Sequence, residues 1–181
     1  MKKSNWIKLV ISLVIPLLAG WIGSAVTLPS ISTWYVTLAK PALNPPSWIF
    51  GPVWTLLYIL MGIALFIVWK KGWKVENRFL IGQDKSWNPW TRAFWSGDWQ
   101  KGNIIAIFAV QLVLNVIWSF IFFGWHQPGL AFFDLLALWF SILYTIVNFY
   151  RVSKAAAWLL LPYILWVTFA GYLNWAIWMG N

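Results

Sequence analysis

Five long apolar segments follow one another along the chain, and the shorter stretches between them carry most of the charge. The segments cover residues 6–27, 48–69, 104–123, 130–150 and 155–179. Each has roughly the 20 residues that an α-helix needs to cross about 30 Å of hydrocarbon. None alternates apolar and polar residues over about 10 positions, as the strands of a membrane β-barrel do. The pattern predicts an all-α integral membrane protein, a single domain over residues 1–181 built as a bundle of five transmembrane helices.

The composition supports a membrane location. Hydrophobic residues make up 61% of the chain and charged residues 9%, which is more apolar than a soluble fold of this length allows. The first apolar segment follows basic residues, as in a secretory signal peptide. Its apolar core is longer than the roughly 7–15 residues of a signal peptide, and no A-x-A cleavage site follows. We therefore interpret it as a transmembrane helix.

Lysine and arginine gather at one end of the predicted helices. Of the 13 basic residues, all but Lys40 lie near the N-terminus, between the second and third helices, or between the fourth and fifth. The positive-inside rule then predicts a cytoplasmic N-terminus and an outer C-terminus. The net charge of +9 indicates this topology and contact with anionic lipid headgroups. It does not indicate nucleic-acid binding, because no groove-reading motif accompanies it.

Polar and aromatic side chains inside the helices gather in the half nearer the outer face. They are Trp54, Thr55 and Tyr58 of the second helix, Gln111, Asn115, Trp118 and Phe122 of the third, Asp134 of the fourth, and Trp166 and Asn174 of the fifth. The small residue Ala170 lies on the same face of the fifth helix as Trp166 and Asn174. Because four helices of alternating direction place these groups at similar depth, we expect a shared cavity. The alternative is that Asn115, Asp134 and Asn174 bond one another and hold the helices together.

Two connecting segments have unusual compositions. The outer loop 28–47 contains Pro41, Pro45 and Pro46, so it cannot be helical throughout. We expect a semi-rigid lid whose Trp34, Tyr35 and Trp48 cover the outer ends of the helices. The cytoplasmic stretch 72–102 carries tryptophans beside basic residues, namely Trp73, Trp87, Trp90, Trp95 and Trp99. We interpret it as an element lying on the membrane surface, with docking of a partner protein as the alternative.

Short motifs occur in a fixed order along nearly the whole chain. They include Trp34-Tyr35, Lys40-Pro41, Pro45-Pro46 and Gly51-Pro52-Val53-Trp54, followed by QLVLN, FFDLL, PYILW and YLNW. This series resembles the TspO/MBR family, the bacterial tryptophan-rich sensory proteins and the mitochondrial translocator protein. The stretch 72–102 departs from the family, whose members usually have a short segment there. The animal cholesterol motif is also incomplete, because no basic residue follows Tyr172.

The resemblance implies a bacterial cell-membrane protein, often a homodimer, with a hydrophobic pocket beneath the first loop. Its implied ligands are porphyrins such as protoporphyrin IX, haem-type tetrapyrroles, sterols, and benzodiazepine-type or isoquinoline carboxamide compounds. Because of the incomplete motif, a tetrapyrrole is favoured over a sterol. No cofactor is expected, since porphyrin enters as ligand or substrate. Carried over by residue, the pocket comprises Trp54, Tyr58, Asn115, Trp118, Phe123, Asp134, Trp166, Ala170 and Asn174, of which only Phe123 rests on the resemblance alone.

The leading hypothesis is a membrane receptor, sensor or transporter that binds porphyrins. One histidine, four acidic residues and no cysteine form no conventional catalytic or metal site, and we interpret His126 as solvated. An enzyme-like alternative is light- and oxygen-dependent degradation of protoporphyrin IX, with Trp54 and Trp166 as the reactive indoles. A membrane scaffold is the second alternative. For the dimer, small residues at four-residue spacing in the first helix, Ala19/Gly23 and Gly20/Ser24, offer one interface, and the third helix offers another.

Overall fold

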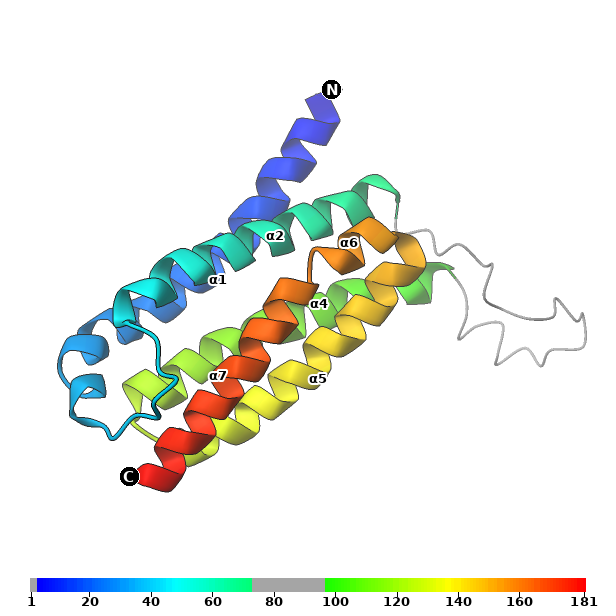
Figure 1. The fold of residues 1–181 in the computed structure, drawn as a ribbon. Coiled ribbons are helices and arrows are strands. Elements are labelled where there is room, and N and C mark those ends of the chain that lie inside the picture. The colour runs from blue at the N-terminus through cyan, green and yellow to red at the C-terminus, as the bar shows by residue number, and fades with distance from the viewer. Residues whose placement is uncertain (1–2, 73–96) are drawn as a thin grey trace, which may run out of the picture.

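The computed structural model describes residues 3–72 and 97–181, with side chains at 3–72 and 102–181. This part of the chain is helical: α1 Lys3–Ser32, η1 Tyr35–Thr37, η2 Ser47–Ile49, α2 Phe50–Lys70, α4 Gly97–Ser119, η4 Phe120–Gly124, α5 Pro128–Val152, α6 Lys154–Trp158 and α7 Leu161–Gly180. Five spans within it are long and apolar enough to cross a membrane. The predicted all-α bundle of five transmembrane helices is confirmed (Figure 1).

Helix α1 is longer than the sequence pattern predicts. It continues through Pro29 to Ser32, so only residues 33–47 remain of the loop expected at 28–47. A proline inside a helix leaves the carbonyl four residues earlier, here that of Ala25, without its usual partner. The loss is tolerated because Pro29 is exposed near the end of the helix. The hydroxyl of Thr33 donates to the Pro29 carbonyl at 2.9 Å and helps to close this last turn.

The last apolar segment is broken, although a continuous helix was expected over 155–179. Helix α6 ends at Trp158 and α7 begins at Leu161. The cause is Pro162, whose ring clashes with the carbonyl four residues earlier, that of Trp158, if the helix continues. In the observed arrangement Pro162 lies in the first turn of α7, where its missing N–H costs least.

The third span also differs at both ends. It starts at Gly97, inside the stretch expected to be an insertion, and it ends in the π-helical turn η4. In that turn the amide of Trp125 donates to the Phe120 carbonyl at 2.8 Å, and Ser30 of α1 donates to the Phe123 carbonyl at 2.6 Å. The remainder of the insertion, 73–96, and the side chain of Trp99 lie outside the described residues, so its interfacial role stays a prediction.

Helix α1 packs on α2 and α4, while α5 packs on α4 and α7. Small residues make the α1 contacts possible. A Cβ at Gly62 would lie 2.8 Å from the Ser12 carbonyl oxygen, one at Gly20 would lie 2.2 Å from the Tyr58 ring, and one at Gly23 would lie 2.9 Å from Ser119 Oγ. Gly20 and Gly23 of α1 therefore pack inside the bundle, so their spacing does not support a dimer interface. The homodimer itself stays a prediction.

Candidate functional site

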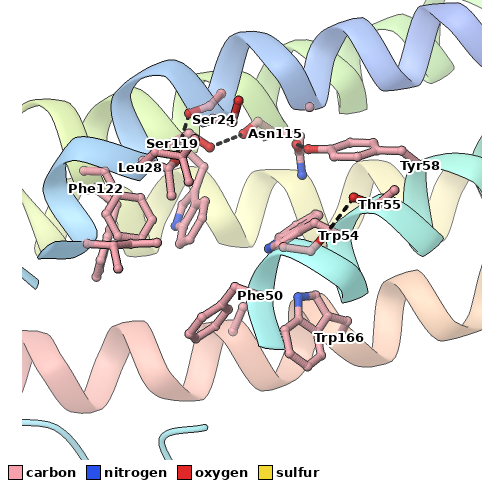
Figure 2. Close-up of a pocket in the computed structure, with 18 of the residues that line it drawn as sticks. Ser24, Leu28, Phe50, Trp54, Thr55, Tyr58, Asn115, Ser119, Phe122 and Trp166 are labelled. Carbon is pink, nitrogen blue, oxygen red and sulfur yellow. Dashed lines mark hydrogen bonds between the residues drawn. The ribbon is translucent and has the colours of Figure 1, made fainter. Parts of the chain in front are cut away.

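A cavity of about 330 Å³ lies between α1, α2, α4, η4 and α7, with Tyr35 of η1 at its outer end. Eight of the nine residues expected to form the pocket line it: Trp54, Tyr58, Asn115, Trp118, Phe123, Trp166, Ala170 and Asn174. Trp54, Tyr58, Asn115 and Trp166 converge on it from α2, α4 and α7 (Figure 2). Seven of these eight were predicted by counting depth along the helices, and Phe123 by the family resemblance alone.

Aromatic rings form most of the wall. Trp54 stacks on Tyr58 with ring centres 5.7 Å apart, and its ring lies 6.5 Å from that of Trp118. Phe50 meets Trp166 edge to face at 6.0 Å. Such rings offer flat apolar faces with a weakly negative surface, which favour planar aromatic ligands. No charged side chain is among the described residues that line the cavity.

The amide side chains of the cavity bond to other helices. Tyr58 Oη donates to Asn115 Oδ1, and Asn115 Nδ2 donates to Tyr163 Oη at 3.3 Å. These bonds join α2, α4 and α7. Asn115 is 2% exposed, so its partners replace water that the hydrocarbon cannot supply. The interhelical role considered for Asn115 is real, but its partners are tyrosines and not Asp134 or Asn174.

Asn174 makes a second set of bonds at the outer end. Its Oδ1 accepts from Trp118 Nε1 at 3.1 Å, and its Nδ2 donates to the Pro128 carbonyl at 2.7 Å. The first bond fixes the orientation of the Trp118 ring against the cavity, while the second ties α7 to the start of α5. Asn174 therefore acts as a positioning residue whose polar groups are already occupied.

Two indole groups in the wall have no hydrogen-bond acceptor among the described side chains. Trp166 Nε1 is buried and unpartnered, and Trp54 Nε1 makes no hydrogen bond with the described part of the chain. Both residues line the cavity. A buried N–H without a partner costs about 1–3 kcal/mol. The two side chains thus contribute indole N–H donors that have no acceptor among the described residues.

Asp134 does not line the cavity, contrary to expectation. Helix α5 packs behind α4 and α7 and contributes no residue to the lining. Asp134 is half-buried there, and its Oδ2 has no hydrogen-bond partner in the described structure. Gln111 is also absent from the lining, although it lies on the Asn115 face of α4. Position along a helix therefore did not predict the direction in which these two residues face.

The lid closes the outer end of the cavity through Tyr35, which is 4% exposed. Its hydroxyl donates to Asn44 Oδ1 at 2.6 Å, and its ring lies 5.8 Å from that of Phe123. Burial raises the pKa of Tyr35, which keeps the phenol protonated as a donor. Trp34 covers Phe122 at 5.5 Å. Trp48 does not serve as a cover, because it is 74% exposed.

Two contacts outside the cavity hold the lid in place. The side chain of Asn181 accepts from the Ala39 amide at 3.0 Å and donates to the Ala39 carbonyl at 3.2 Å. His126 is exposed, as expected of a solvated histidine, but it also stacks on Trp34 with ring centres 4.3 Å apart. No group of three or more potential metal ligands occurs among the described residues.

Helix α1 also contributes to the cavity wall, which the sequence pattern did not predict. Leu17, Gly20, Gly23 and Ser24 line the cavity. The spacing of the small residues Gly20, Gly23 and Ser24 was the available signal, but it was interpreted as a dimer contact. Some lining residues on α1 and α2 are exposed to the surroundings, including Trp21 at 72% and Thr55. The cavity therefore reaches the lateral surface between the outer halves of these two helices.

Comparisons with known proteins identify the family of the chain. The sequence model of the TspO/MBR family matches residues 12–179. The chain is 40% identical to the tryptophan-rich protein TspO of Archaeoglobus fulgidus, with 98% of this chain and 99% of the relative covered. It is 33% identical to the translocator protein of Bos taurus (97% and 91%) and 30% identical to the tryptophan-rich sensory protein of Cereibacter sphaeroides (78% and 72%). The chain is an integral membrane protein that belongs to the TspO/MBR family.

Proposed function

We propose that the protein binds porphyrins, protoporphyrin IX above all, in the cavity beneath the lid and acts as a membrane receptor, sensor or transporter for them. The observation that carries the proposal is an uncharged aromatic cavity with two indole donors lacking acceptors, Trp54 and Trp166. The names of two relatives, a sensory protein and a translocator protein, agree with such a role.

The cavity chemistry decides how such a ligand would lie. The cavity volume of about 330 Å³ is at the lower end of the range for ligand pockets. One edge of a macrocycle therefore enters the cavity, while the rest of the ring occupies the opening between α1 and α2. Propionate groups stay outside, because burying an unpaired charge costs far more than the contacts return. The same cavity suits neutral, carbonyl-bearing aromatic compounds such as isoquinoline carboxamides, whose carbonyl accepts from Trp54 or Trp166.

A titration of protoporphyrin IX in the dark, followed by fluorescence quenching in nanodiscs, tests this proposal. Trp166→Phe keeps an aromatic ring but removes the donor, so we expect a loss of affinity of about 2- to 10-fold, the value of one hydrogen bond. Trp125→Phe is the matched control, since Trp125 is 65% exposed and does not line the cavity. Equal affinities for the two variants would contradict binding at this site.

Photo-oxidative degradation of porphyrin is the second candidate. It is favoured by the same two indoles, because oxidisable rings at a ligand's edge are suitably placed to react with an excited porphyrin in the presence of oxygen. Recovery of unchanged porphyrin after illumination in oxygenated buffer would contradict degradation, and the receptor or transporter function would remain. The scaffold alternative rests on the stretch 72–102, of which residues 73–96 lie outside the described part, and it gains no support from the cavity.

For topology we propose a cytoplasmic N-terminus in a bacterial cell membrane. Lys3, Lys70, Lys71 and Arg151 all lie at the same end of the described helices, as the positive-inside rule requires of a cytoplasmic face. A cysteine introduced at Lys3 should be labelled by a membrane-impermeant maleimide only after the cells are opened. Labelling in intact cells would show that the N-terminus lies outside and would contradict the proposed topology.

A further inference from the structure

A second hollow lies on the outside of the bundle, in the half nearer the lysine-rich end. It is a groove of about 790 Å³ between α1 and α4, with residues of α2 at its base. Its walls include Ile11, Ile15 and Ile22 of α1 and Phe108 and Val113 of α4. Several of them are exposed, Val113 to 56%. The N-terminal part of α1 leans away from the other helices on this side (Figure 1). The groove is separate from the cavity beneath the lid and shares no residue with it.

The groove matches one leaflet of a bilayer in length. Ile11 and Ile22 mark its two ends on α1 and are eleven residues apart, which corresponds to about 16 Å of helix. Half of the hydrocarbon thickness of a membrane is about 15 Å. An extended acyl chain from the leaflet on the lysine side therefore fits the groove from end to end.

A positive charge lies at the headgroup end of this groove. Lys8 is one turn before Ile11 on α1, and its Nζ lies 5.9 Å from the ring centre of Trp69, which lines the groove. Lys8 makes no ion pair with the described side chains, among which Asp134 is the single carboxylate and lies in the opposite half of the bundle. The ammonium group thus keeps hydrogen-bond donors for an external anion.

We infer that the groove between α1 and α4 is a binding site for an anionic phospholipid, with an acyl chain along α1 and the phosphate on Lys8. A second copy of the chain fits the charges less well. In a two-fold dimer whose axis is parallel to the membrane normal, both Lys8 groups would lie at one depth. No carboxylate among the side chains described at 3–72 and 102–181 lies at that depth to pair with them. An anionic lipid supplies the missing charge.

Native mass spectrometry of delipidated protein tests this site and reports the oligomeric state in the same spectrum. Dioleoyl phosphatidylglycerol and dioleoyl phosphatidylcholine are titrated separately. Lys8→Gln should weaken phosphatidylglycerol binding about fivefold, the contribution of one basic residue near a lipid surface, and leave phosphatidylcholine binding unchanged. Lys3→Gln is the charge control, since Lys3 is exposed on the first turn of α1. Equal phosphatidylglycerol affinities for the two variants would overturn the inference.

A second pair of variants tests the acyl-chain part of the site. Ala109 lines the groove and Ala106 does not, although both are exposed on α4. Ala109→Trp should lower the affinity for both lipids at least fivefold, while Ala106→Trp leaves both unchanged. If Ala109→Trp turns dimers into monomers and phosphatidylglycerol still binds with wild-type affinity, the groove is an interface between copies and the lipid site is wrong. Circular dichroism confirms that each variant is folded.

Discussion

Replacing Tyr58 by Phe breaks the bond that joins α2 to α4 at the cavity wall. The ring and its stacking on Trp54 remain, but Asn115 Oδ1 loses its donor while the residue stays 2% exposed. An unsatisfied buried acceptor costs about 1–3 kcal/mol, whereas hydrogen bonds between transmembrane helices average about 0.6 kcal/mol. We expect a loss of about 1–2 kcal/mol in the free energy of unfolding.

The double mutant separates this bond from general packing. Asn115→Leu removes the acceptor, so the further change Tyr58→Phe should cost less than it does in the wild type. The expected coupling is at least about 0.5 kcal/mol, as found for residues that share a hydrogen bond. Unfolding is measured by titration with sodium dodecyl sulfate and followed by circular dichroism. Tyr144→Phe, on the exposed face of α5, is the control. Strictly additive losses would refute the bond as a stabilising contact.

Three further predictions concern the site and its lid. Trp54→Phe and Trp166→Phe should slow any light-dependent conversion of protoporphyrin IX, measured as product yield under matched illumination, because the oxidisable indole is lost; wild-type yields would argue against the indole mechanism. Asp134→Ala should change porphyrin affinity less than twofold in dark titrations, because Asp134 does not line the cavity; a large loss would place it at the ligand. Asn181→Ala removes both side-chain bonds to Ala39 and should speed ligand release severalfold in a dilution experiment, whereas an unchanged rate would mean that the lid does not limit release.

The sequence predicted the number of membrane-spanning helices because this depends on local properties. Hydrophobic length defines a span, and residue count along a helix gives height in the membrane at about 1.5 Å per residue. Trp54, Asn115 and Trp166 were recognised in this way before any contact was known. The interruption near Leu160 also has a local signal, because the ring of Pro162 would clash with the Trp158 carbonyl in a continuous helix.

Other features depend on which helices are neighbours, and spacing along the chain does not contain that information. Asp134 has the expected height but belongs to α5, which stands behind the cavity. Gly20 and Gly23 have the same spacing whether they contact a second chain or, as found here, Tyr58 and Ser119 of their own chain. Rotation of a helix about its axis is therefore the quantity that the sequence left undetermined.

Filling the cavity tests the proposed site most directly. Ala170 lines it from α7 and is half-buried, so Ala170→Phe places a ring in the space assigned to the porphyrin. Ala137→Phe adds the same ring to the exposed face of α5 and serves as the control. Affinity for protoporphyrin IX is measured in the dark in nanodiscs. We expect a loss of at least tenfold for Ala170→Phe and wild-type affinity for Ala137→Phe; wild-type affinity for both variants would show that porphyrin does not bind in this cavity.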